Sequence, residues 1–272
     1  MIAVVDYQKG NLKSVERGLI AAGGEAFITA DASEIAKADA IVLPGVGAFA
    51  DAAATMCELG QMEAIRDRVR AGVPFLGICL GEHLMFEHGV EGAPEGNPAC
   101  GLGLLPGTVV AMPRCDAQGK VFKVPHVGWN TIEMPACNGS GETVAVPPCG
   151  EGGGNAVLSS GGAGGGAARS SAAKRGLFEH GAFPGSAPQA GSELAFACPL
   201  FDGIAPGEYF YFTHSYIAPT GSHTIAETAH SVRFTSAVQF GERAFGVQFH
   251  PEKSSDAGAR VLANFVAIAA RG

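Results

Sequence analysis

One cysteine of the chain lies between two glycines, in residues 77–81 with the sequence GICLG. An apolar, strand-like run at 73–78 leads into it, and a helix-like stretch from Leu80 to Glu87 follows. The glycines allow a tight strand-to-helix turn that raises the side chain above the sheet edge, where a helix N-terminus favours thiolate over thiol. The pattern predicts a nucleophile at Cys79. The alternative is a small buried cysteine in a glycine-rich turn, and this segment alone favours neither.

A histidine and a glutamate stand two residues apart at the end of another apolar run, in His250-Pro251-Glu252. In an extended chain both side chains point to the same side, and Pro251 stiffens that geometry. The carboxylate can hold one ring nitrogen of His250 and leave the other to take a thiol proton. Such a pair is usually a solvated surface pair, but together with Cys79 it predicts a catalytic triad. His214 is a second candidate base and ranks lower, because no carboxylate follows two residues later.

Attack of a thiol on an acyl carbon also needs backbone N–H groups directed at the developing negative charge. The N–H of Leu80, directly after the predicted nucleophile, is one candidate. The other is the loop at 44–47 (PGVG), whose two glycines let the backbone approach a substrate. Taken alone, that loop is better interpreted as a plain turn before a helix.

Apolar runs alternate with helical patterns in the first half of the chain, which predicts strands at 2–5, 40–43 and 73–78 and helices at 13–22, 48–58 and 61–71. Fully apolar strands indicate a doubly wound, flavodoxin-like α/β fold, with a mostly parallel sheet covered by helices on both faces and its sites at the strands' carboxyl ends. The C-terminal part is predicted to be strand-rich and to return to the same sheet. Its expected elements are strands at 208–217, 223–229, 234–240 and 244–249 and a helix at 256–270 with Ser255 as N-cap.

The composition narrows the classes of partner. The 272 residues carry 18 Lys and Arg against 26 Asp and Glu, a net charge of -8 without a compensating basic cluster, so neither nucleic acid nor an anionic membrane is an expected partner. The chain has no leader-like start and no apolar stretch of about 18 residues, which predicts a soluble, cytoplasmic protein. Its seven cysteines contain no C-x-x-C pair, which argues against a disulfide framework and a zinc site. No cofactor and no metal is expected.

Residues 138–192 differ from the rest of the chain, because 32 of these 55 residues are glycine, alanine or serine. Such a segment buries too little apolar area to offset the entropy lost on ordering. We expect a single domain over 1–272 that carries 138–192 as a mobile surface insertion.

Together these segments resemble those of the triad, or class I, glutamine amidotransferases. Further motifs, spread over most of the chain outside 138–192, are similar to those of the glutaminase subunits of imidazole glycerol phosphate synthase. They are Asp6-Tyr7, Gly10-Asn11-Leu12, Pro44-Gly45-Val46-Gly47-Ala48-Phe49, Pro125-His126-Val127-Gly128-Trp129-Asn130, Tyr209-Phe210-Tyr211-Phe212-Thr213-His214-Ser215-Tyr216 and Phe249-His250-Pro251-Glu252-Lys253-Ser254.

The resemblance implies that Cys79 attacks the side-chain amide of L-glutamine, that His250 acts as base and then acid, and that Glu252 orients His250. Water then releases glutamate, and the ammonia passes to a cyclase subunit, a (βα)8 barrel bound as a heterodimer, which makes imidazole glycerol phosphate and aminoimidazole carboxamide ribonucleotide for histidine biosynthesis. The oxyanion and substrate contacts it implies are Gly45, Val46, Gly47, Leu80, His83, Thr213, Ser215 and Tyr216. The implied interface residues are Asn11, Trp129, Asn130, Tyr211 and Lys253.

Two features depart from the family pattern. Glu82-His83 replaces the common Met-Gln after the nucleophile, and His83 cannot offer the same amide hydrogen-bonding pattern to glutamine. Glu82 is expected either to point to solvent or to favour a charged His83. The second departure is the insertion, since Asn130 and Pro199 are much farther apart in sequence than the family norm.

Three other functions stay open from the sequence. The chain could be a glutaminase that supplies another ammonia acceptor, which co-purification with a cyclase would decide. It could be a stand-alone cysteine hydrolase acting on γ-glutamyl peptides, which would need no partner for full turnover. It could also be a weakly catalytic scaffold that only binds the cyclase, an alternative that His83 keeps open.

Overall fold

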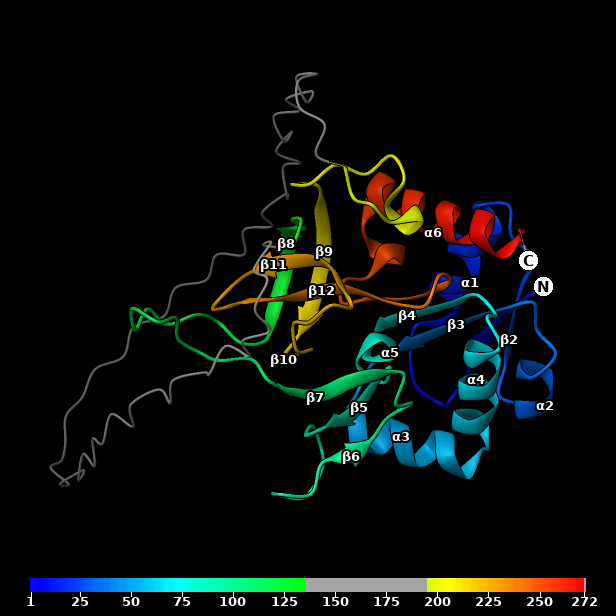
Figure 1. The fold of residues 1–272 in the computed structure, drawn as a ribbon, viewed down its shortest axis with the longest axis horizontal. Coiled ribbons are helices and arrows are strands. Elements are labelled where there is room, and N and C mark those ends of the chain that lie inside the picture. The colour runs from blue at the N-terminus through cyan, green and yellow to red at the C-terminus, as the bar shows by residue number, and fades with distance from the viewer. Residues whose placement is uncertain (136–194, 272) are drawn as a thin grey trace, which may run out of the picture. The chain divides into compact units, whose positions relative to one another are not determined.

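The computed structural model describes residues 1–135 and 195–271. Its main feature is a seven-stranded sheet with the strand order β11-β12-β13-β4-β3-β1-β2 (Figure 1). The five strands from β13 to β2 run parallel, while β11 and β12 extend the sheet antiparallel at one edge. The strands are β1 (Ile2–Val5), β2 (Ala26–Thr29), β3 (Ala40–Gly45), β4 (Phe75–Cys79), β11 (Thr224–Ala229), β12 (Arg233–Phe240) and β13 (Ala244–Val247).

Helices cover both faces of this sheet (Figure 1). On one face α1 (Leu12–Ala21) and α6 (Ser255–Ala269) pack over Val4, Val42 and Ile78. On the other face Val5, Leu43 and Phe75 pack against a set of four helices. These are α2 (Ala32–Ile35), α3 (Phe49–Glu58), α4 (Gln61–Arg70) and the single turn α5 (Leu80–His83). The central strands are apolar along their whole length because both of their faces are buried, and the predicted doubly wound α/β fold is confirmed.

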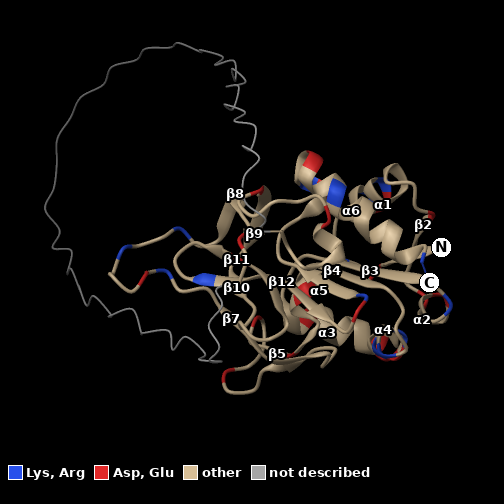
Figure 2. Ribbon diagram, turned by 45° about the horizontal axis from the view of Figure 1, so that its top comes forward, with Lys and Arg blue, Asp and Glu red and all other residues tan. Residues whose placement is uncertain are grey.

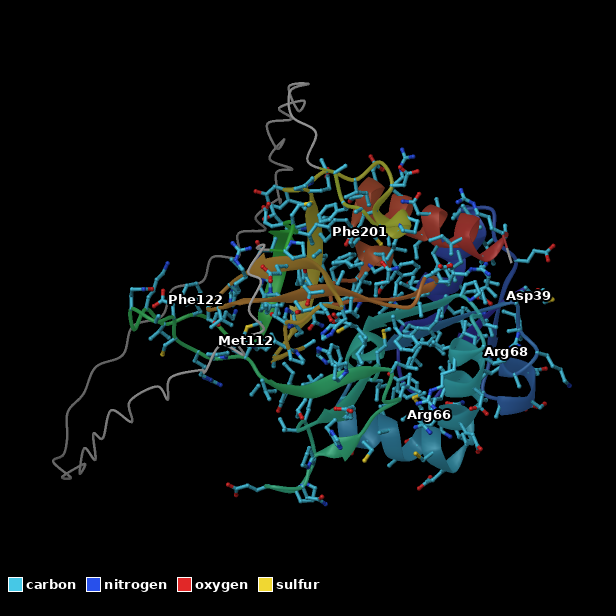
Figure 3. All side chains as sticks on the ribbon, viewed as in Figure 1. Asp39, Arg66, Arg68, Met112, Phe122 and Phe201 are labelled. Atoms are coloured by element: carbon cyan, nitrogen blue, oxygen red, sulfur yellow. The ribbon has the colours of Figure 1, made fainter. Side chains whose placement is uncertain are left out.

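Most of the charged residues lie outside this core, and Glu82 and Glu227 are buried exceptions. Figure 2 shows Lys, Arg, Asp and Glu on the outer helices and loops, whereas β3 and β4 carry none. Two arginines of α4, labelled in Figure 3, attach the helix to neighbouring segments: Arg66 Nε donates to the Leu102 carbonyl at 2.8 Å, and Arg68 donates to the Ala38 carbonyl at 2.8 Å. These bonds hold α4 in place beside the sheet.

Two smaller sheets adjoin the main one. One has the order β10-β7-β5-β6, and the other pairs β8 with β9 antiparallel. Their strands are β5 (Phe86–Gly89), β6 (Ala99–Cys100), β7 (Leu105–Ala111), β8 (His126–Thr131), β9 (Tyr209–His214) and β10 (Tyr216–Ile217). The 3-10 turns η1 (Pro199–Phe201) and η2 (Pro251–Lys253) complete the described elements.

Several sequence predictions need correction. The strand predicted over 208–217 is two strands, β9 and β10, and neither joins the main sheet, although β11 to β13 do as expected. The helix predicted to run to Glu87 ends at His83, because Phe86 pairs with Leu105 as part of β5. The N-cap of α6 is Ser254 rather than Ser255.

Other predictions concern the cysteines and the insertion. Cys57, Cys79, Cys100 and Cys198 are free. Cys115 is disulfide-bonded, so the argument against disulfides fails at that residue. The predicted insertion 138–192 lies outside the described residues and stays a prediction. Within the described residues, no helix has the length and apolar character needed to cross a membrane.

Candidate active site

Cys79 is the last residue of β4 and occupies a strained backbone conformation. Its φ is +53°, in a region that non-glycine residues rarely adopt, and it leads directly into the single turn α5. Gly81 makes this turn possible, because a Cβ there would collide with the carbonyl oxygen of Leu43. The expected strand-to-helix turn is therefore present, but α5 is so short that its dipole contributes little at the sulfur.

His250 follows β13, the strand next to β4, with Val247 paired to Ile78. This pairing brings the imidazole to the same sheet edge as Cys79. Its Nδ1 lies 2.9 Å from Glu252 Oε1, and both side chains are almost fully buried. The contact is as predicted, but its geometric reason differs: the chain turns through η2 at Pro251 instead of staying extended.

The electrostatics of His250 reflect its neighbours. Burial alone would lower the pKa of the imidazole, yet interactions with Cys79 and Glu252 outweigh it and raise that pKa to about 9. A raised imidazole pKa favours transfer of the thiol proton to His250. These contacts are compatible with the predicted roles of Cys79 as nucleophile, His250 as base and Glu252 as the acid that orients His250.

A cavity of about 370 Å³ opens beside the sulfur. Most of the predicted substrate contacts line it, and Gly45 does not, because it lies within β3 paired with Cys79. The lining residues are Val46, Gly47, Ala48, Cys79, Leu80, His83, Glu91, Pro125, Thr213, His214, Ser215 and Tyr216. A larger hollow of about 580 Å³ does not include Cys79, since it lies among residues at the opposite end of the strands, such as Ile2 and Ala40.

The loop expected to supply an oxyanion donor already uses one of its amides. The N–H of Val46 donates to the Tyr7 hydroxyl at 3.1 Å, so it is not free to bind a substrate oxygen. Tyr7 is fully buried, and this burial raises the pKa of its phenol. Reorientation of the Val46 amide would be needed before it could stabilise an oxyanion.

The two residues that depart from the family pattern are both buried. Glu82 is fully buried and neither points to solvent nor charges its neighbour, which corrects both expectations for it. Burial raises the pKa of Glu82 well above its usual value and lowers the pKa of His83 to about 4. His83 lines the cavity, as predicted, with Nε2 2.7 Å from Gln248 Oε1.

Three polar residues in or beside the cavity were not identified as site residues from the sequence. Gln248 donates from Nε2 to the Cys79 sulfur at 3.7 Å, and Glu91 lines the cavity with a pKa raised by burial. Tyr7 is the third. Gln248 lies two residues before His250, and that spacing at a strand end was an available signal. Nothing in the local sequence around Glu91 indicates its place in the cavity.

The predicted second base lies in a separate hydrogen-bonded group. His214 Nε2 is 3.0 Å from His126 Nδ1, and its own Nδ1 faces the Tyr216 carbonyl at 2.8 Å. Burial lowers the pKa of both rings. His214 lines the cavity, but both its nitrogens already have hydrogen-bond partners, which favours the prediction of His250 over His214 as the base.

The predicted interface residues lie outside the cavity. Trp129 and Tyr211 are cross-strand partners in β8 and β9, with ring centroids 6.1 Å apart, and Lys253 Nζ lies 5.9 Å from the Tyr211 ring. Asn130 bonds to the Ala229 carbonyl within the chain, and Asn11 is exposed at the start of α1. The first three form one partly exposed surface.

Residues 3–146 and 156–269 match the family model described as glutamine amidotransferase class-I. The chain belongs to this family, as the fold and the Cys79 site indicate.

Its relatives include two proteins named imidazole glycerol phosphate synthase subunit HisH. That of Moorella thermoacetica is 36% identical, covering 97% of this chain and 93% of the relative, and that of Syntrophotalea carbinolica is 33% identical, covering 97% and 98%. A solved glutamine amidotransferase structure matches with a TM-score of 0.57 at 16% identity, covering 99% of this chain and 100% of the other. The PurLQS structure from Thermotoga maritima matches with a TM-score of 0.56 at 14% identity, covering 98% and 97%. At these identities the structural matches show the fold alone.

Proposed function

We propose that the chain hydrolyses L-glutamine to glutamate and ammonia, as the glutaminase subunit of an imidazole glycerol phosphate synthase. The observation that carries the proposal is the convergence of Cys79, His250 and Glu252 at one sheet edge beside a cavity. The named relatives cover nearly the whole chain and support the choice of pathway.

In the proposed reaction His250 accepts the proton of the Cys79 thiol, and the thiolate sulfur attacks the amide carbon of glutamine. His250 then donates that proton to the departing nitrogen as the C–N bond breaks, which releases ammonia and leaves a thioester. A water molecule, deprotonated by His250, attacks the thioester carbon, and the C–S bond breaks to give glutamate and the free thiol. Glu252 keeps the ring oriented and stabilises its positive charge throughout.

The cavity residues suit an amino acid. Glu91 can pair with an α-ammonium group when its carboxyl is ionised, and Ser215 and Tyr216, which also line the cavity, offer further polar groups. The volume of about 370 Å³ is within the range of small-molecule sites. Gly47 and Leu80 line the same cavity, and their backbone N–H groups are the proposed donors to the oxyanion.

The ammonia needs a partner that consumes it before it is protonated in bulk water. We propose a (βα)8 cyclase subunit that docks on the surface formed by Trp129, Tyr211 and Lys253, with Asn11 and Asn130 at its margin. The Trp129 side chain is 48% exposed. Exposed aromatic rings next to one another are typical of a surface that a partner protein covers. The reaction needs Cys79 as a free thiol, which a reducing cytoplasm would preserve, although the disulfide at Cys115 does not follow from that setting.

The test is Cys79→Ser, assayed in the complex with the cyclase subunit. Glutamine-dependent product formation should fall by about a thousandfold or more, because nucleophilic catalysis is lost, while turnover driven by added ammonium salt should persist. Cys57→Ser, at an exposed free cysteine of α3, is the matched control and should keep both activities. Retained glutamine-dependent turnover in Cys79→Ser would refute the proposal.

The same assay without the cyclase separates the stand-alone hydrolase from the subunit. Full glutamine turnover by the isolated chain would favour the hydrolase, and stimulation by the cyclase would favour the subunit.

A further inference from the structure

His83 has no place in the triad, yet it connects to the reactive sulfur through a single side chain. It is 3% exposed, and its Nε2 lies 2.7 Å from Gln248 Oε1. The other end of that carboxamide, Nε2 of Gln248, lies 3.7 Å from the Cys79 sulfur. The carboxamide thus bridges an imidazole and the predicted nucleophile.

The direction of each hydrogen bond along this bridge follows from the chemistry of its groups. A carboxamide oxygen only accepts hydrogen bonds, so the proton between His83 and Gln248 must reside on the His83 Nε2 atom. Burial lowers the pKa of His83 to about 4, so the ring is neutral at physiological pH and Nε2 carries its one N–H proton. With Oε1 held in this way, the amide N–H of Gln248 must face the sulfur.

The sulfur needs such a donor. The carbonyl oxygen of Thr213 lies 3.9 Å from Cys79 Sγ, and a carbonyl accepts from a thiol but repels a thiolate. The titratable groups that interact with the sulfur or line the cavity beside it are Tyr7, His83, Glu91, His214, Tyr216 and His250. Of these only His250 carries positive charge, so an N–H donor adds stabilisation that His250 does not supply alone.

We infer that His83 is a positioning residue for the nucleophile: by holding Gln248 Oε1 it keeps the amide N–H directed at the Cys79 sulfur and stabilises the thiolate. The inference rests on the proposed role of Cys79. When the thiolate forms, its proton passes to His250, and the His83–Gln248 bond stays unchanged. Without His83, the Gln248 carboxamide can rotate by half a turn and present its oxygen to the sulfur. An oxygen acceptor there favours the thiol over the thiolate.

The test measures the rate at which iodoacetamide alkylates Cys79 in the full chain as a function of pH, followed by mass spectrometry of the Cys79 peptide. His83→Phe and Gln248→Met should each slow alkylation at neutral pH about five- to tenfold and move the midpoint of the pH profile upward by about 0.7 to 1 unit. His83→Gln can donate from its own amide to Gln248 and should retain the native midpoint. His223→Phe, a half-buried histidine that bonds to the Pro219 carbonyl, is the matched control and should also retain it.

A native midpoint in either His83→Phe or Gln248→Met would overturn the inference, and so would an upward shift in His83→Gln equal to that of His83→Phe. Should His83→Phe fail to fold, Gln248→Met and His83→Gln decide the question. The failure of the proposed function looks different, because Cys79→Ser would then keep glutamine hydrolysis whatever the alkylation profiles show.

Discussion

At the scale of single residues, Glu82 is a carboxyl group in a buried position, which opposes folding. It is fully buried, and neither carboxyl oxygen has a hydrogen-bond partner among the described residues. Its Cγ, together with side-chain atoms of Met85 and Val238, lies close over Gly246. Burial raises its pKa well above the usual value and favours the neutral form, and a buried carboxyl without a hydrogen-bond partner costs stability.

Replacing this carboxyl with an apolar group of similar length should therefore stabilise the protein. Glu82→Met is expected to raise the free energy of unfolding at neutral pH by about 1–3 kcal/mol, because an unpaired buried polar group is removed while the volume is kept. Denaturant unfolding followed by circular dichroism measures this. Glu63→Gln, at an exposed position of α4, is the control and should change stability by less than about 0.5 kcal/mol. A loss of stability in Glu82→Met would mean that the carboxyl has a favourable partner.

The raised pKa of Glu82 also makes the stability of the protein depend on pH. In the unfolded chain Glu82 loses its proton near pH 4.5, whereas in the folded chain it keeps the proton to a higher pH. The folded state therefore binds more protons, and this group's contribution to stability falls as pH rises above about 4.5. The stability of Glu82→Gln relative to the native chain should rise across that range, and a pH-independent difference would contradict the assignment.

At the scale of elements, the turn from β4 into α5 depends on close backbone approach. A Cβ on Gly81 would collide with the backbone of Leu43 in β3, which cannot move without breaking the sheet. Local patterns predicted this turn well, because flanking glycines and an apolar strand are readable in sequence. They failed at the end of α5, since the pairing of β5 with β7 overrides the helical pattern of residues 84–87.

Gly81→Ala should accordingly destabilise the fold by about 3 kcal/mol or more, or prevent folding, because backbone must shift to admit one methyl group. The control is Gly18→Ala in α1, where the new Cβ would meet only the flexible end of Leu262 and alanine favours the helix. Its stability should change by about 1 kcal/mol or less. Denaturant midpoints of the two variants test the difference, and equal midpoints would contradict the role assigned to Gly81.

At the scale of the whole molecule, the surface of Trp129, Tyr211 and Lys253 should govern partner binding and not folding. Trp129→Ala is expected to weaken binding to the cyclase subunit about thirtyfold or more, because large aromatic rings dominate interface energies. Calorimetric titration of the full chain with the cyclase measures the affinity. Ile20→Ala, at a 52% exposed apolar residue of α1, should leave it unchanged. Equal affinities for Trp129→Ala and the native chain would place the interface elsewhere.

The segment 138–192 belongs to this scale as well. Among the described residues, both faces of the sheet carry an extensive buried core. We therefore expect deletion of 138–192, with the ends joined by a short turn, to keep the fold and the glutaminase activity, since loop closure depends weakly on length. Solubility and thermal unfolding of the deletion variant test this. An insoluble product would show that the segment contributes to packing.

The sequence by itself determined the α/β class, the turn at Cys79 and the neighbourhood of His250 and Glu252, because each depends on residues close together in the chain. Only the tertiary structure decided which strands lie side by side, and hence that β13 brings His250 to the sulfur delivered by β4. The same long-range pairing joins His83 to Gln248 and the Val46 amide to Tyr7. Contacts of this kind depend on packing between distant segments, and local periodicity carries no information about that packing.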